Sequence, residues 1–162
     1  MQIGVIADTH IPDFKKALPD AVASLFGGVD LIIHAGDITD ARVLLELERI
    51  APVAAVQGNR DSDALKVRLP QKLILTLCGH RVGVIHGDGE KGTTMQRITG
   101  FFPENPVECV IFGHSHIPCN QVIDGVLYFN PGSPTAKRRQ AYPSVGILEI
   151  GDMIEGRHIF LA

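Results

Sequence analysis

Short apolar runs rich in β-branched residues recur along the chain, and each run ends in a cluster of Gly, Asp, His or Pro. In the first third of the sequence these runs are residues 2–7, 29–33 and 53–56, which predict buried strands. Between them, residues 19–26 and 40–50 carry apolar side chains at helical spacing. Strands that alternate with helices in this order predict a parallel sheet with right-handed crossovers.

The second half of the chain has a different pattern, in which short strands are separated mainly by turn residues. Asp124-Gly125 and Gly151-Asp152 are dipeptides typical of tight hairpins, so the strands around them are expected to pair antiparallel. The whole pattern predicts an α/β fold of two sheets flanked by helices. In this half we expect strands at 73–77, 81–85, 109–112, 120–123, 126–130, 145–150 and 154–160, and a short helix at 93–101.

Length and composition indicate one compact domain over residues 1–162. With 45% hydrophobic and 20% charged residues, the chain lies in the ordinary range of globular proteins. Its formal net charge of -3 gives no sign of a nucleic-acid or membrane surface, so neither is an expected partner. The basic cluster Lys137-Arg138-Arg139 is expected to be a solvated loop.

Cysteine usage and the start of the chain favour a cytoplasmic protein. Cys78, Cys109 and Cys119 have no C-x-x-C spacing, so neither a disulfide framework nor a structural zinc site is indicated. Cys78 and Cys109 lie in apolar runs and are expected to be small buried side chains. The chain opens directly on an apolar strand, and no apolar stretch reaches the roughly 18 residues of a membrane span. A homo-oligomer is compatible with this composition.

Polar residues follow five of the predicted strands at the point where each strand ends. The carboxyl ends of parallel strands meet at one edge of a sheet, where the ligands of α/β proteins bind. Adjacent glycines allow the backbone to turn sharply there, so that the polar side chains can converge. The five segments are Asp8-Thr9-His10, Gly36-Asp37, Gly58-Asn59-Arg60-Asp61, His86-Gly87-Asp88 and Gly113-His114-Ser115-His116.

Each segment alone can be explained as a helix cap or a turn, although the paired imidazoles of His114 and His116 suit a metal. Together the segments indicate a metal centre. Carboxylates mixed with imidazoles and one amide, without a thiolate, favour Mn, Fe, Zn, Ni or Co over Ca or Mg. Seven candidate ligands are too many for one ion, so we expect two divalent ions that share a carboxylate. Two ions about 3.5 to 4 Å apart, with a hydroxide between them, predict hydrolysis of a small-molecule phosphoester.

The order of these segments resembles the calcineurin-like metallophosphoesterase superfamily. The resemblance rests on D-x-H, G-D, G-N-x-D, H-G and G-H-x-H motifs that follow one another from Asp8 to His116. The segment Asn130-Pro131-Gly132-Ser133 is similar to the small bacterial and archaeal phosphodiesterase branch, and extends the match over most of the chain. The resemblance implies a four-layer α-β-β-α sandwich and hydrolysis of phosphodiesters, sometimes of monoesters, with Mn²⁺ or Ni²⁺.

Carried over residue by residue, the resemblance implies two metal positions bridged by the carboxylate of Asp37. Together with the neighbouring Arg60, Asp37 and Asn59 are the expected catalytic residues. The expected ligands are Asp8, His10, Asp37 and His116 for the first ion, and Asp37, Asn59, His86 and His114 for the second.

Arg60 departs from the superfamily pattern, because many members have a His after the metal-binding Asn that is thought to protonate the leaving group. Arginine does not release its proton in the working pH range. Arg60 therefore either clamps the phosphate and stabilises transition-state charge, or is an exposed loop residue. The neighbouring Asp61 either orients a ligand or closes the turn.

Of the other histidines, His34 lies inside a predicted strand and is expected in the core or behind the ligands, whereas His80 and His158 are expected at the surface.

Two rival functions use the same fold. The fold also resembles the retromer scaffold subunit, in which the metal site has decayed, but all seven candidate ligands are present here. A regulatory metal-binding protein without turnover is the other alternative, and chelator-sensitive hydrolysis separates it from an enzyme.

Overall fold

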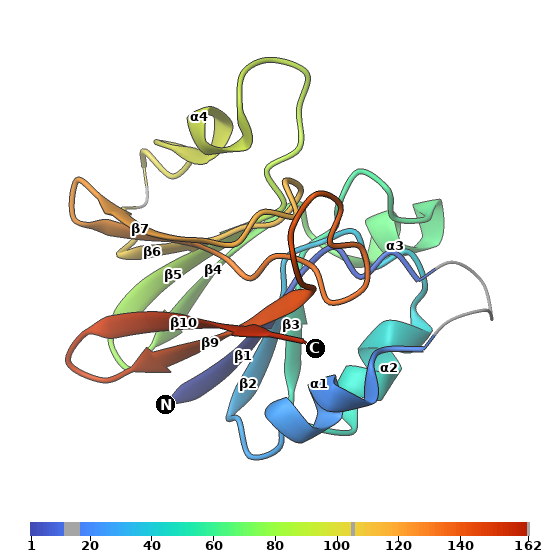
Figure 1. The fold of residues 1–162 in the computed structure, drawn as a ribbon. Coiled ribbons are helices and arrows are strands. Elements are labelled where there is room, and N and C mark those ends of the chain that lie inside the picture. Colours follow the sequence, from blue (N-terminus) through green and yellow to red (C-terminus); the bar gives the residue numbers. More distant parts are fainter. Residues whose placement is uncertain (12–16, 105, 162) are drawn as a thin grey trace.

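Two stacked five-stranded sheets with helices on their outer faces form the molecule, as Figure 1 shows. The computed structural model describes residues 1–11, 17–104 and 106–161. The predicted four-layer α-β-β-α sandwich is confirmed, with two mixed sheets at its centre. In the part of the chain that is described, no helix has the length and apolar character needed to cross a bilayer.

The first sheet joins the strands at the start of the chain to the hairpin at its end. Its strands, in spatial order, are β10 (Ile154–Phe160), β9 (Ser144–Ile150), β1 (Gln2–Ile6), β2 (Leu31–His34) and β3 (Val53–Ala55). The three strands β1, β2 and β3 run parallel, whereas β9 is antiparallel to both of its neighbours. The predicted parallel unit and the predicted terminal hairpin are therefore confirmed.

The second sheet is built from the middle of the chain. Its strands, in spatial order, are β4 (Lys72–Leu77), β5 (His80–Ile85), β6 (Cys109–Ile111), β8 (Val126–Asn130) and β7 (Cys119–Ile123). β5, β6 and β8 run parallel, and each edge strand pairs antiparallel with its neighbour. The pairing of β7 with β8 confirms the hairpin predicted around Asp124-Gly125. Cys109 is buried as expected, but the expectation for Cys78 was wrong, because this residue lies exposed in the β4–β5 turn with a φ of 50°.

The helices are shorter than the sequence predicts, and one of them was not expected. The unexpected helix, α3 (Asp63–Arg68), begins after Ser62, whose hydroxyl accepts a hydrogen bond from the Leu65 N–H. Leu65 is its one buried residue, so α3 lacks the apolar stripe that would predict a helix. On the outer face of the first sheet lie α1 (Asp20–Leu25) and α2 (Arg42–Glu48), and on that of the second lies α4 (Thr94–Ile98).

Apolar side chains fill all three spaces between the four layers. Alternate residues of β1 point to opposite faces of the first sheet, so Ile3 and Val5 pack toward the second sheet and Ile6 packs toward the helices. Between the sheets they meet side chains such as Val84 and Phe129. A third cluster lies between the second sheet and α4. The two sheets are therefore held face to face, and their strand ends are brought to a common edge.

Candidate metal centre

The five polar segments predicted from the sequence meet at the seam between the two sheets. The Asp8 N–H donates to the Gly36 carbonyl at 3.0 Å, which joins the segments that follow β1 and β2. The Gly113 N–H donates to the His86 carbonyl at 3.1 Å, which joins the segments that follow β5 and β6. The two sheets are linked where the His114 N–H donates to Asp8 Oδ1 at 3.2 Å.

Most of the predicted ligands have a strained backbone. Residues other than Gly rarely adopt a positive φ. Each residue held in this conformation costs about 1 to 3 kcal/mol of conformational free energy, and such residues cluster at functional sites. The surrounding segments must therefore hold these residues firmly in place. The φ angles are 54° at Asp8, 40° at His10, 57° at Asp37, 63° at His114 and 59° at His116.

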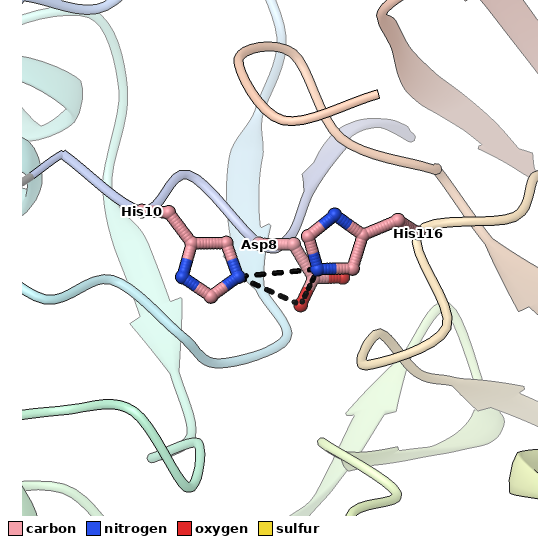
Figure 2. A group of neighbouring side chains, drawn as sticks. All are labelled: Asp8, His10 and His116. Carbon is pink, nitrogen blue, oxygen red and sulfur yellow. Dashed lines mark hydrogen bonds and ion pairs between the residues drawn. The ribbon is translucent and has the colours of Figure 1, made fainter. Parts of the chain in front are cut away.

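A first group of donor atoms comes from Asp8, His10 and His116, as Figure 2 shows. The Nε2 atoms of His10 and His116 are 3.1 Å apart, and the two rings are stacked with their centroids 4.9 Å apart. Asp8 Oδ1 lies 3.8 Å from His10 Nε2 and 3.5 Å from His116 Nε2. One carboxylate oxygen and two imidazole nitrogens thus face a common point.

A second group consists of Asp8, Asp37 and His86, all of them buried. His86 Nε2 lies 3.3 Å from Asp37 Oδ2 and 4.0 Å from Asp8 Oδ1. Asp37 Oδ2 is also 3.4 Å from His10 Nε2 in the first group. Both carboxylates therefore lie between the two sets of imidazoles, so Asp8 as well as the predicted Asp37 has the position of a bridge.

Backbone groups fix the orientation of three of these side chains. His116 Nδ1 is 2.5 Å from the Ala136 carbonyl, and His86 Nδ1 is 2.8 Å from the Ala35 carbonyl. Because a carbonyl oxygen only accepts, each Nδ1 carries the proton, and each Nε2 can be a lone-pair donor aimed at the carboxylates. Asp37 Oδ1 accepts the Arg60 N–H at 2.7 Å, which leaves Oδ2 at the centre.

Two buried atoms at the centre have no hydrogen-bond partner. Among the residues that the structure describes, these atoms are Asp8 Oδ2 and His86 Nε2. His86 Nε2 lies close to Asp37, but the contact does not have the geometry of a hydrogen bond. Such atoms are costly unless something satisfies them. A divalent cation would satisfy both, and mixed carboxylate and imidazole donors suit a transition metal. The residues present therefore fit the predicted metal.

The electrostatics of the centre point the same way. Burial raises the pKa of Asp8 to about 7, and burial lowers the pKa of His116 to about 4. Burial alone would lower the pKa of His86, but its contact with Asp37 and the charge of Asp8 raise it to about 9. For Asp37, His86 outweighs burial and lowers the pKa to about 2. A cation bound here would therefore displace a proton from His86.

A surface pocket of about 400 Å³ opens above the two groups. Asn59 and Arg60 are exposed in it, and His114 is half-buried, with its ring 5.2 Å from that of His86 in a T-shaped arrangement. His114 thus lies outside the two groups, and Asn59 lines the same pocket. The pocket is lined by His10, Asp37, Asn59, Arg60, His114, His116, Ala136 and Arg138.

The whole arrangement matches a known family. Residues 1–153 match the model of the calcineurin-like phosphoesterase superfamily domain. The chain belongs to this superfamily. It is a metallophosphoesterase by family, and the two groups of donor atoms are its candidate metal ligands.

Similar proteins agree with this assignment. A probable metallophosphoesterase of Methanothermobacter thermautotrophicus is 41% identical over 150 residues, which cover 93% of this chain and 86% of that protein. A phosphodiesterase of Methanocaldococcus jannaschii is 26% identical over 165 residues, covering 92% and 93%. The solved structure of Entamoeba histolytica Vps29 in complex with zinc has a TM-score of 0.77 at 19% identity and covers 99% of both chains. This last likeness shows a shared fold.

Two further predictions about the metallophosphoesterase site concern the residues behind it. Asp61 Oδ1 accepts the Thr39 N–H and its Oδ2 accepts the Gly58 N–H, both at 2.7 Å, so Asp61 closes the loops after β2 and β3. His34 is fully buried, and its Nε2 lies 3.2 Å from Thr9 Oγ1. Its expected place in the core, behind the ligands, is confirmed.

One further sequence expectation away from the ligands was wrong. His158 is half-buried: its ring stacks on Phe129 at 4.9 Å and its Nε2 donates to the Asn130 carbonyl at 2.7 Å. His80 lies at the surface, as expected, between Glu108 Oε1 at 2.9 Å and the carbonyl of Gly151 at 3.0 Å. Arg138 is exposed in a loop, as expected, and it also lines the metallophosphoesterase pocket. Nothing in the sequence of this basic loop indicates that one of its residues lines the pocket.

Proposed function

We propose that this protein is a dinuclear metal-dependent phosphodiesterase. The observation that carries the proposal is the pair of donor groups, Asp8–His10–His116 and Asp8–Asp37–His86, in each of which the donor atoms lie within 4.8 Å of one another. They are joined through shared carboxylates at the base of one pocket. Two adjacent groups of this kind are what a two-metal hydrolase needs.

The proposed ligands of the first ion are Asp8, His10, Asp37 and His116. Those of the second are Asp37, Asn59, His86 and His114. Mn²⁺ is the ion we expect, and Ni²⁺, Fe²⁺, Zn²⁺ or Co²⁺ suit the same donors. When bound, two such ions lower the pKa of a water molecule toward neutrality and stabilise the attacking and leaving oxygens of an in-line displacement at phosphorus.

Arg60 is the proposed phosphate-binding residue of the site. Its backbone N–H holds Asp37 Oδ1, and its side chain lines the pocket above the ligands. A guanidinium there can donate two parallel hydrogen bonds to phosphate oxygens and stabilise the negative charge of the transition state. Because arginine does not supply a proton to the leaving group, we expect faster hydrolysis of esters whose leaving groups are weakly basic.

The space around the site supports a diester substrate. A second hollow of about 440 Å³ adjoins the first and shares Asn59 with it. Its lining includes Lys66, Gln71 and Phe101, so it offers both polar and aromatic surface. A phosphodiester carries an organic group on each side of phosphorus, and two adjoining hollows give room for both. The similarity to a phosphodiesterase of M. jannaschii supports the same substrate class.

The alternative is a regulatory metal-binding module of the same fold with negligible turnover. The observation that favours it is Arg60, which stands where many members of the superfamily have a proton-donating His. Both functions require the same metal ligands. Hydrolysis is therefore the property that distinguishes the two.

The decisive experiment measures hydrolysis of bis-p-nitrophenyl phosphate by metal-stripped protein before and after addition of Mn²⁺, with p-nitrophenyl phosphate as the matched monoester. We expect activity that appears with Mn²⁺, disappears with a chelator and is higher on the diester. Faster hydrolysis of the monoester would contradict the diesterase assignment. Two bound Mn²⁺ ions without hydrolysis of either compound would favour the regulatory module.

A further inference from the structure

Arg138 shares a rare backbone conformation with the candidate metal ligands. In the described part of the chain, nine residues other than Gly have a positive φ. Two of them, Cys78 and Asp124, form hairpin turns, and the last is Arg138, with a φ of 50°. A strained residue persists only where its surroundings hold it, which points to a function. The remaining six belong to the ligand segments and are Asp8, His10, Asp37, Thr39, His114 and His116.

The loop that carries Arg138 is tied to the candidate ligands themselves. Ser133 Oγ donates to the Asp8 carbonyl at 2.8 Å and accepts the Ala136 N–H at 2.8 Å. The carbonyl of Ala136, two residues before Arg138, is the partner of His116 Nδ1. The hydrogen bonds that orient the ligand segments therefore also fix the position of Arg138.

Arg138 brings a positive charge to the site. It lines the same pocket as His10, His116 and Arg60. Among the described residues, neither Arg60 nor Arg138 forms an ion pair with a carboxylate. Two guanidinium groups in one pocket repel each other and any bound metal cation. An anion between them removes this repulsion.

We propose that Arg138 is a second phosphate-binding residue, which contacts the anionic phosphoryl group of the substrate together with Arg60. Arg60 follows β3 of the first sheet and Arg138 follows β8 of the second, so the phosphoryl group is bound from both sheets. This inference rests on the proposed function, since it places the phosphate of a phosphoester above the metal ligands. The ligand class is a phosphate ester, and inorganic phosphate is the simplest probe of it.

The test compares Arg138→Met with Arg139→Met, whose exposed neighbouring side chain is not part of the pocket lining. Binding of inorganic phosphate to Mn²⁺-saturated protein is measured by calorimetry, and bound Mn²⁺ by elemental analysis. We expect Arg138→Met to bind phosphate at least about tenfold more weakly than the wild type, and Arg139→Met to stay within about twofold. Both variants should keep the wild-type Mn²⁺ content, because neither residue is a ligand.

Equal phosphate affinities in the two variants would overturn the inference, whether or not the protein hydrolyses diesters. So would undetectable phosphate binding by the wild type, or a loss of Mn²⁺ confined to Arg138→Met, which would assign Arg138 to the integrity of the metal site. Phosphate binding that depends on Arg138 in a protein that hydrolyses no ester would support the inference and contradict the proposed function.

Discussion

At the scale of single residues, Asp37 connects the two halves of the candidate metal centre. Its Oδ2 lies 3.4 Å from His10 Nε2 and 3.3 Å from His86 Nε2, whereas its Oδ1 is occupied by the Arg60 N–H. One oxygen thus serves the centre and the other anchors the loop that carries Arg60. Removal of this carboxylate should disturb the proposed metal ions and the proposed phosphate-binding residue Arg60 together.

We predict that Asp37→Ala loses most of its Mn²⁺ and at least about 100-fold in activity on bis-p-nitrophenyl phosphate. The matched control is Asp152→Ala, which removes an equal charge from an exposed turn. Mn²⁺ content and initial rates at saturating Mn²⁺ are the measurements. Two bound ions and full activity in Asp37→Ala would refute the assignment of this residue as a ligand.

The convergence of Asp8, His10, Asp37, His86 and His116 could be predicted from the sequence, because carboxylates and imidazoles are chemically distinctive and follow the strands directly. The place of Arg138 in the pocket could not. Its position depends on the path of the loop after β8 and on hydrogen bonds between backbone groups of distant segments, such as Ala136 and His116. Stacking of His158 on Phe129 escaped prediction for the same reason, since it arises from tertiary packing.

At the scale of elements, the loops after the strands leave little space around the ligands. Gly58, which follows β3, is buried, and a Cβ atom at this position would overlap the N and Oδ1 atoms of Asp37. These atoms belong to a ligand in a strained conformation, so they cannot yield without moving the carboxylate. Only Gly fits at position 58, because the backbone of the loop that carries Asn59 and Arg60 lies so close to Asp37.

Gly58→Ala is expected to weaken Mn²⁺ binding at least about tenfold and to lower the free energy of unfolding by about 1 to 3 kcal/mol. Gly151→Ala is the control, because a Cβ atom there meets nothing within 4 Å, and its unfolding free energy should stay within about 0.5 kcal/mol of the wild type. Urea unfolding and metal titration measure the two effects. Equal behaviour of the two variants would show that the loop after β3 accommodates a methyl group.

The strands and hairpins were easier to predict than the helices. Apolar runs and turn dipeptides such as Asp124-Gly125 define each strand locally, and the observed pairs follow them. Helix α3 has one buried residue, Leu65, and begins after the Ser62 cap. Lys66 Nζ within it donates to the Asn59 carbonyl at 3.0 Å. Where a helix buries so little surface, its apolar pattern is too weak to predict it.

At the scale of the whole molecule, the candidate centre joins the two sheets. Asp8, His10 and Asp37 follow strands of the first sheet, and His86 and His116 follow strands of the second. The fold could be predicted because alternating strands and helices allow few arrangements. The seam itself could not, since no local pattern shows which strand ends of the two sheets will face each other.

Metal binding across this seam should stabilise the fold. A ligand present at about 100 times its dissociation constant raises the free energy of unfolding by about 2.7 kcal/mol. This corresponds to a rise in Tm of roughly 5 to 10 °C for a protein of this size. We predict such a rise for the wild type when Mn²⁺ is added to metal-stripped protein, and its absence in Asp37→Ala. Differential scanning calorimetry provides the measurement, and an unchanged Tm at saturating Mn²⁺ would exclude binding to the folded state.

Because the candidate ligands come from both sheets, the proposed metal would act on the persistence of the protein as well as on its chemistry. If manganese is the bound ion, its scarcity would leave the seam without this cross-link, the unfolded fraction would grow and proteases would remove it. A cell with little manganese is therefore expected to contain less of this protein, not merely an idle form of it. Abundance would then follow the metal supply without a dedicated sensor.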